Sequence, residues 1–158
     1  MAKKNVELDD KEVRKALQRL ARKNPRMVRA VLDRWAETVI GIAEDKYLNA
    51  APGDRRHLHS RTGRLSSSLR KWFAGNEKVY VGTNVKYAAI HEYGGVIRPR
   101  RAQYLRWKDR DGQWHMARKV RIPARPYLKT SIRDLFKSHR ARNLAINTLR
   151  RDLRRHWK

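Results

Sequence analysis

Apolar residues recur every three or four positions through the first 50 residues, which is the spacing of one buried helix face. A stripe over residues 13–21 predicts a first helix that begins at Asp9 or Asp10 and ends before Pro25. Asn24 can cap a second helix, whose first position suits proline. This helix is predicted to run to residues 48–50 and to be the main core helix, through Val28, Val31, Leu32, Trp35, Val39, Ile42 and Ala43.

In the middle of the chain, apolar and polar residues alternate with a period of two. Residues 71–74 and 78–83 predict a hairpin around Gly75-Asn76, preceded by a short helix from Thr62 to Leu69. The three serines at 66–68 sit in no nucleophile motif, so a polar helix face is the simpler interpretation.

Residues 84–93 return to helical spacing and end at Gly94, a residue that closes helices readily. Residues 96–121 then predict an exposed second hairpin, with arms 103–108 and 113–120 around a four-residue loop.

Each arm of this second hairpin has apolar residues at alternate positions. Leu105 and Trp107 share a face of the first arm, and Trp114, Met116 and Val120 share a face of the second. The other faces carry Arg106, Lys108, His115, Lys119 and Arg121. We therefore expect one apolar and one cationic face, typical of a flap against another subunit. A strand pair packed on the core is the alternative.

The prolines at 123 and 126 favour extended chain, and Pro126 can open a last helix. Leu128, Ile132, Leu135 and Phe136 form its apolar stripe, and a basic amphipathic helix follows a break near residues 138–143. The predicted class is α+β: a small, mainly antiparallel sheet with an exposed hairpin, two N-terminal helices, a short middle helix and a long C-terminal helix. One domain is expected over residues 1–158, with a helical part (1–50), an α+β core (60–135) and a basic C-terminal helix (136–158).

Composition narrows the possible functions. A chain of 158 residues can bury roughly 70% of its unfolded surface, so it can form a hydrophobic core without disulfides or a structural metal. It has no cysteine, which excludes disulfides and thiolate metal sites. We expect no signal peptide, because the basic N-terminus lacks an apolar segment, and no membrane span.

Charge is the strongest compositional signal, with 40 Lys and Arg against 15 Asp and Glu, a net charge of +25. Residues 1–50 carry a net +4, residues 95–125 a net +8 and residues 133–158 a net +7. Such an excess draws a protein to polyanions, usually nucleic acid. A solvated, self-repelling surface would explain part of it without a ligand.

Candidate reaction chemistry is sparse. His57 and His59 lack a third ligand and make a weak metal site. His91-Glu92 could serve a nuclease as base and metal ligand, but eight of the 15 carboxylates precede residue 51, which leaves the middle of the chain poor in acidic ligands. These residues therefore argue against a metal site and against a nuclease or other hydrolase.

Four motifs in a fixed order resemble the tailed-bacteriophage virion-morphogenesis family of head–tail joining or tail-completion proteins. The resemblance covers roughly residues 60–135 and rests on Thr62, Gly63, Leu65, Gly82, Tyr87, Ala88, His91, Glu92, Tyr93, Gly94, Arg125, Pro126 and Tyr127. It implies an α+β subunit with no enzymatic activity and no cofactor. Such subunits form a ring, commonly a hexamer, at the head–tail junction or the head-proximal end of the tail. The motif residues would be structural, with Tyr87, His91 and Tyr93 packing the short helix onto the sheet.

A ring of six such chains would carry about +150, six times +25, and would repel itself unless a polyanion or acidic neighbours offset the charge. We expect cations to face lumenal double-stranded DNA or partner proteins, namely the head connector and the tail-tube or terminator protein. The candidates are Arg98, Arg100, Arg101, Arg106, Lys108, Arg110, Arg150, Arg151, Arg154 and Arg155. The subunit interface is expected at Leu105, Trp107, Trp114 and Met116.

The expected location is the virion, after assembly in the host cytoplasm. A stand-alone nucleic-acid-binding protein stays open as an alternative, because Tyr104, Trp107 and Trp114 alternate with cations and could stack on unpaired bases. Sequence patterns do not separate the head side from the tail side of the junction.

Overall fold

The computed structural model describes residues 15, 18–19, 22–49, 57–58, 62–109, 111–137 and 139–156. The chain divides into two compact units. Residues 1–85 and 127–158 form the first, here called the core unit, and residues 86–126 form the second, the insert. The predicted first helix falls mostly outside the described residues, and the single-domain organisation stays a prediction.

The core unit is built on helix α2 (Pro25–Ile42). The side chain of Asn24 accepts a hydrogen bond from the Met27 backbone N–H at 3.4 Å, and Pro25 takes the first turn, where its missing N–H costs nothing. The chain continues as a π-helix, η1 (Ala43–Leu48). The second predicted helix is therefore confirmed, including its end near Leu48.

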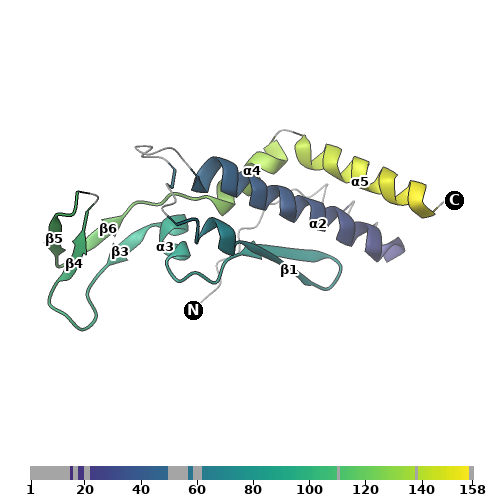
Figure 1. The fold of residues 1–158 in the computed structure, drawn as a ribbon. Helices are drawn as coiled ribbons and strands as arrows, with labels where there is room; N and C mark the ends of the chain where they lie inside the picture. The colour runs from purple at the N-terminus through teal and green to yellow at the C-terminus, as the bar shows by residue number, and fades with distance from the viewer. Residues whose placement is uncertain are drawn as a thin grey trace. The chain divides into compact units, whose positions relative to one another are not determined.

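Helix α2 is the middle layer of the core unit (Figure 1). Helices α4 (Leu128–Lys137) and α5 (Arg140–His156) pack along one side of it, separated by His139 at a φ of 52°. The antiparallel hairpin of β1 (Arg70–Ala74) and β2 (Lys78–Gly82) lies along the other side. The predicted break between two C-terminal helices is confirmed.

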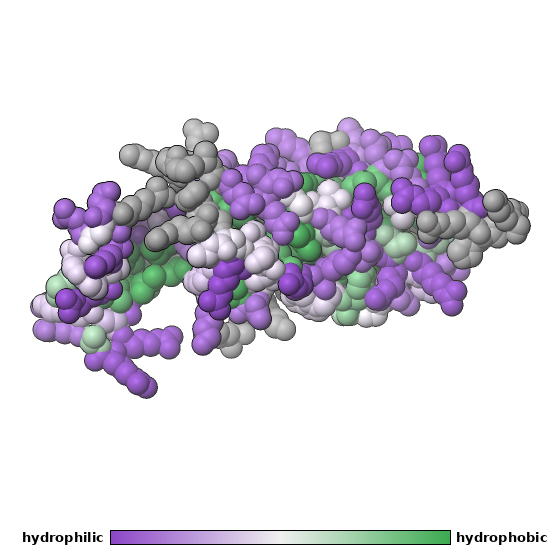
Figure 2. Space-filling view, in the orientation of Figure 1, coloured by the Kyte–Doolittle hydropathy of each residue, from purple (hydrophilic) through white to green (hydrophobic). Residues whose placement is uncertain are grey.

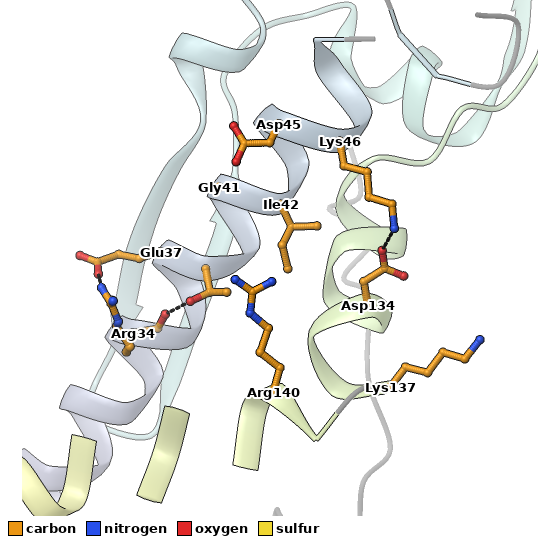
Figure 3. A pocket seen from close by; sticks show the side chains of 10 residues that line it. Arg34, Glu37, Gly41, Ile42, Asp45, Lys46, Asp134, Lys137 and Arg140 are labelled. Atoms are coloured by element: carbon orange, nitrogen blue, oxygen red, sulfur yellow. Dashed lines mark hydrogen bonds and ion pairs between the residues drawn. The ribbon is translucent and has the colours of Figure 1, made fainter. Parts of the chain in front are cut away.

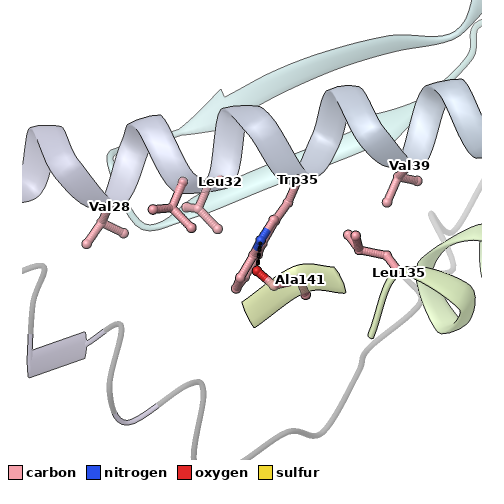
Figure 4. Packing of buried hydrophobic residues seen from close by; sticks show 7 residues of the cluster. Val28, Leu32, Trp35, Val39, Leu135 and Ala141 are labelled. Atoms are coloured by element: carbon pink, nitrogen blue, oxygen red, sulfur yellow. Dashed lines mark hydrogen bonds between the residues drawn. The ribbon is translucent and has the colours of Figure 1, made fainter. Parts of the chain in front are cut away.

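Trp35 joins these layers from the buried face of α2. Its side chain is 7% exposed, and its indole N–H donates to the Ala141 carbonyl oxygen at 2.9 Å (Figure 4). Its ring and the ring of Phe136 pack edge to face, with centroids 5.1 Å apart. Burial of a side chain of this kind stabilises a fold by about 3 kcal/mol. The prediction that Trp35 is a core residue is confirmed, and Val39 and Leu135 pack beside it.

The predicted helix over Thr62–Leu69 is wrong, because only Ser66–Ser68 form one 3₁₀ turn, η2. Gly63 has a φ of 66°, and all three serine hydroxyls donate to carbonyl oxygens three residues earlier. Serine side chains that bond nearby backbone groups compete with helix formation.

The insert contains one short helix, α3 (Ala88–Tyr93), and two separate antiparallel strand pairs. Strand β3 (Gly95–Ile97) pairs with β6 (Val120–Ile122), and β4 (Leu105–Lys108) pairs with β5 (Trp114–Ala117). With the β1–β2 hairpin, these pairs make the mixed α+β fold that the sequence predicts. The middle helix is shorter than predicted and begins four residues later.

The predicted faces of the β4–β5 hairpin are wrong. The loop spans five residues, 109–113, because Asp109 accepts hydrogen bonds from the Asp111 and Gln113 backbone N–H groups at 3.0 and 2.8 Å. Trp107 consequently pairs with His115, and Trp114 pairs with Lys108. Since a shift of one residue moves a strand's side chains to the other face, the two indoles lie on opposite faces of the hairpin.

Candidate functional site

The end of α3 is the tightest junction of the insert. Gly94 has a φ of 70°, and a Cβ there would lie 2.8 Å from the Ala124 nitrogen and 3.1 Å from the Ile122 oxygen. The Arg125 N–H donates to the His91 carbonyl oxygen at 2.7 Å. Glycine is needed here for its backbone conformation and for the close approach of a second chain segment.

His91 and Arg125 each bury a nitrogen at this junction. His91 Nδ1 and Arg125 Nε have no hydrogen-bond partner in the described part of the chain. Burial, followed by the nearby charge of Arg125, lowers the pKa of His91 below its usual value, so the imidazole is neutral at pH 7.

Tyr87 and Tyr93 do not pack as the resemblance implies, because 42% and 46% of their surfaces stay exposed. Buried positions of α3 are Ala88 and Glu92, at 5% exposure each, and Ile90 lies against Gly95. His91 is half-buried, with the Tyr87 ring edge-on at 5.8 Å. Two tyrosines of the motif therefore face outward.

The other motif residues shape local backbone in the core unit. Thr62 accepts a hydrogen bond from the Arg64 N–H at 3.4 Å, and Leu65 is buried. Tyr127, 1% exposed, immediately precedes α4, and its carbonyl oxygen accepts from the Ser131 hydroxyl at 2.6 Å. At Gly82, a Cβ would lie 2.9 Å from the Trp72 ring.

The insert exposes most of its large apolar side chains. Seven of the nine most exposed in the described part of the chain belong to it: Tyr87, Tyr93, Val96, Ile97, Trp107, Trp114 and Met116. Side chains of β3 are exposed on both faces of the strand, and Figure 2 shows apolar surface along the β3–β6 pair. Exposed aromatic and aliphatic surface of this kind marks interaction sites.

Two cations flank Trp114, which is 61% exposed. The Arg106 guanidinium lies 5.3 Å from the ring centroid and the Lys108 ammonium 5.0 Å. The same hairpin face carries Met116, 57% exposed, directly opposite Arg106. The structure thus combines cationic and apolar chemistry on one face, where the sequence predicted separate faces.

The opposite hairpin face is less cationic. Trp107 stacks on His115 at 5.5 Å, and His115 Nε2 lies 2.6 Å from Asp109 Oδ2. The hydrogen bond with His115, followed by the one from the Gln113 N–H, lowers the pKa of Asp109. Leu105 shares this face.

The remaining cationic candidates that the structure describes are solvent-facing. Arg98, Arg100 and Arg101 are exposed before β4, and Arg150, Arg151 and Arg154 are exposed on α5. Arg110 and the Arg155 side chain lie outside the described residues, as do His59 and Trp157.

A groove of about 650 Å³ lies between α2, η1, α4 and the start of α5 (Figure 3). Lys46 Nζ and the Tyr47 hydroxyl both contact Asp134 Oδ2, at 2.6 and 2.7 Å. The bond from Lys46, followed by the one from Tyr47, lowers the pKa of Asp134. These paired groups tie η1 to α4, while the Arg140 guanidinium turns toward α2. Local sequence patterns do not indicate this network, since Asp134 lies 87 and 88 positions from its two partners.

Reaction chemistry has little support in the described part of the chain. There, no group of three or more His, Cys, Asp and Glu residues could hold a metal ion. His57, proposed and set aside as a ligand, lies edge-on to Tyr47 at 5.2 Å. Among these residues, no helix combines the length and apolarity needed to cross a membrane.

The insert exposes apolar and cationic side chains together, a combination that is typical of surfaces that contact other macromolecules. The sequence model of the phage virion morphogenesis family matches residues 45–149, about two thirds of the chain, and the chain belongs to that family. Neither a curated protein nor a solved structure matches it. The family's role is structural, in building the phage particle.

Proposed function

We propose that this chain is a ring-forming subunit, with six copies the expected number, at the head–tail junction or the head-proximal end of the tail. The family match over residues 45–149 carries the proposal. The outward-facing apolar groups of the insert support it, because a subunit that functions only in an assembly leaves its interfaces uncovered when alone. As a building part, it needs no cofactor and catalyses no reaction.

The exposed cations would face lumenal DNA or acidic surfaces of the neighbouring connector and tail proteins. In a closed ring each cation is repeated by symmetry, so polyanion contact removes a large self-repulsion. Free protein at low salt should then be monomeric. A stable hexamer at low ionic strength without nucleic acid would contradict this part of the proposal.

The decisive experiment is electron microscopy of phage particles made without this protein. Filled heads and complete tails that stay separate would support the proposal, and complementation with the wild-type chain should restore joined particles. Normal infectious particles made without the protein would overturn it.

Trp114 supports a second candidate, a stand-alone nucleic-acid-binding protein, because it is 61% exposed and flanked by two cations. Replacing Trp107 and Trp114 by alanine separates the two functions. Loss of binding to an oligo(dT) strand while particles still assemble normally would favour the second candidate. Loss of particle assembly while the strand is still bound would favour the ring.

A further inference from the structure

Helix α5 has two faces of different chemistry. Its apolar face, with Leu144 and Leu149, packs on the core cluster, and the helix runs from the Trp35 contact in the middle of α2 toward the start of α2 (Figure 1). The opposite face is exposed and carries Asn143, Asn147, Arg150, Arg151 and Arg154. At about 100° per residue, these five side chains fall within an arc of about 100° and a length of about 16 Å, here called the α5 stripe.

The charge of the α5 stripe is not offset within the chain. Asp152 is the only acidic residue of α5, and it lies about 100° around the helix from the nearest stripe residue. In the part of the chain that the structure describes, no salt bridge involves a stripe arginine. Helix α2 differs, because its Glu37 contacts both Arg34, at 3.2 Å, and Lys71, at 2.9 Å.

The helix dipole explains only part of this charge. The negative end of a helix attracts cations within its last turn, which here includes Arg154. Arg150 and Arg151 lie before that turn, and the two asparagines lie further back on the same line. The stripe therefore extends beyond what stabilises the end of α5.

The composition of the stripe suits DNA better than a protein partner. Protein–protein interfaces have an apolar centre, whereas protein–DNA interfaces are more polar and more positively charged. The stripe contains no apolar residue, and Leu153, exposed on the same helix, lies about 60° outside it. The insert differs, since Trp114 and Met116, 61% and 57% exposed, accompany Arg106 there.

The stripe matches the chemistry of a duplex backbone. Duplex DNA carries about one negative charge per 1.7 Å of its axis, so about nine phosphate charges lie along 16 Å. Arginine can bind a phosphate through two parallel N–H bonds, and side-chain amides also donate to phosphate and sugar oxygens. The arginines and asparagines of the stripe supply both kinds of contact.

We propose that the α5 stripe binds the phosphate backbone of double-stranded DNA without reading its sequence. The inference rests on the proposed function, and it assigns the lumenal DNA contact to α5 rather than to the cations of the insert. Ring symmetry repeats the stripe in every copy, so each copy adds three arginines to the contact.

Salt-dependent binding of the purified full-length protein to a short mixed-sequence duplex tests this contact. The stripe variant combines three substitutions, Arg150→Gln, Arg151→Gln and Arg154→Gln. The matched control makes the same change at three exposed arginines of the insert, Arg98→Gln, Arg100→Gln and Arg101→Gln. Both variants lower the net charge of +25 by three, so a difference between them reports the position of the charges.

The stripe variant should lower the slope of log affinity against log salt by about 2–3, because each lost phosphate contact removes about 0.9. The insert control should keep the wild-type slope. Arg142→Gln, an exposed position on α5 about 80° outside the stripe, should also keep it. Lysine at the three stripe positions retains the charge and should retain most of the slope, which separates loss of charge from damage to α5.

Equal changes of slope in the stripe variant and the insert control would overturn the contact, because net charge alone would then explain binding. A lysine variant that loses as much as the glutamine variant would also overturn it. So would a loss of affinity for polyglutamate as large as that for the duplex, since the stripe would then be a general anion surface. The ring is tested separately: joined particles made without the protein would overturn the ring and leave this binding comparison intact.

Discussion

The core unit and the insert differ in how far each buries its apolar side chains. Helix α2 and α4 hold fully enclosed side chains such as Val31 and Leu135, both 0% exposed. In the insert, only Ala88 and Glu92 are buried among the described residues. Isolated strand pairs are marginally stable without an apolar layer to pack on. The core unit therefore holds the enclosed apolar side chains that stabilise a fold, while the insert leaves most of its large apolar side chains exposed.

Replacing Trp35 by alanine should have the largest effect, because it removes the central contact of the core unit and the hydrogen bond to Ala141. We expect a loss of about 3–5 kcal/mol in the free energy of unfolding, measured by urea denaturation. Trp114→Ala, the same change at an exposed site, should cost less than about 0.5 kcal/mol. Similar losses for both would remove the distinction between the units.

Gly94→Ala should loosen the insert alone. The added Cβ would lie 2.8 Å from the Ala124 nitrogen at a φ of 70°, so the β3–β6 pair must shift. Gly112→Ala is the control, since its φ is 80° but nothing lies within 4 Å, and it should cost only the backbone strain of about 1 kcal/mol. Amide hydrogen exchange should rise at β3 and β6 in the first variant only, with the α2 amides unchanged in both.

Asp134→Ala should destabilise the core unit by about 1–2 kcal/mol at pH 7, because the Tyr47 hydroxyl loses its acceptor. Lys46, followed by Tyr47, lowers the pKa of Asp134 in the folded state. Its contribution is therefore present above the carboxyl's ordinary pKa and is lost as pH falls through the folded value. Urea denaturation of both proteins at pH 7 and pH 2.5 should show the difference shrinking in acid. An equal difference at both pH values would exclude the carboxylate as the cause.

Lowering the pH should have the smallest of these effects, a loss of stability that is confined to the insert. Burial, followed by Arg125, lowers the pKa of His91, so the unfolded state binds a proton more readily and stability falls as pH drops below about 6.5. Exchange of the β3 and β6 amides, corrected for its intrinsic pH dependence, should therefore accelerate between pH 7.5 and 5.5. His91→Gln should abolish the added acceleration, and an unchanged profile in that variant would assign the effect to another group.

The spacing of apolar residues was sufficient to predict the elements that bury one face. The stripes of α2 and α4 predicted the core around Trp35 and Leu135, because burial forces a regular spacing. The face of the β4–β5 hairpin was not predictable in this way. Its register depends on whether Gln113 belongs to the loop, which the Asp109 side chain decides through two hydrogen bonds.

The stacked pair of Trp72 and Tyr80 on the outer face of the β1–β2 hairpin was missed for a different reason. Trp72 and Tyr80 alternate with the apolar positions that face α2, so their pattern signals only an outward face. Gly82 was the available hint, since a glycine ending a strand can make room for a large neighbouring ring. The Asp134 network joins η1 to α4, and local spacing carries no information about such distant partners.

An odd count of loop residues gives the β4–β5 hairpin one indole on each side. Each side of the hairpin therefore carries its own aromatic surface, Trp114 beside Arg106 and Lys108 on one side and Trp107 against His115 on the other. A single substitution removes either surface and leaves the other in place.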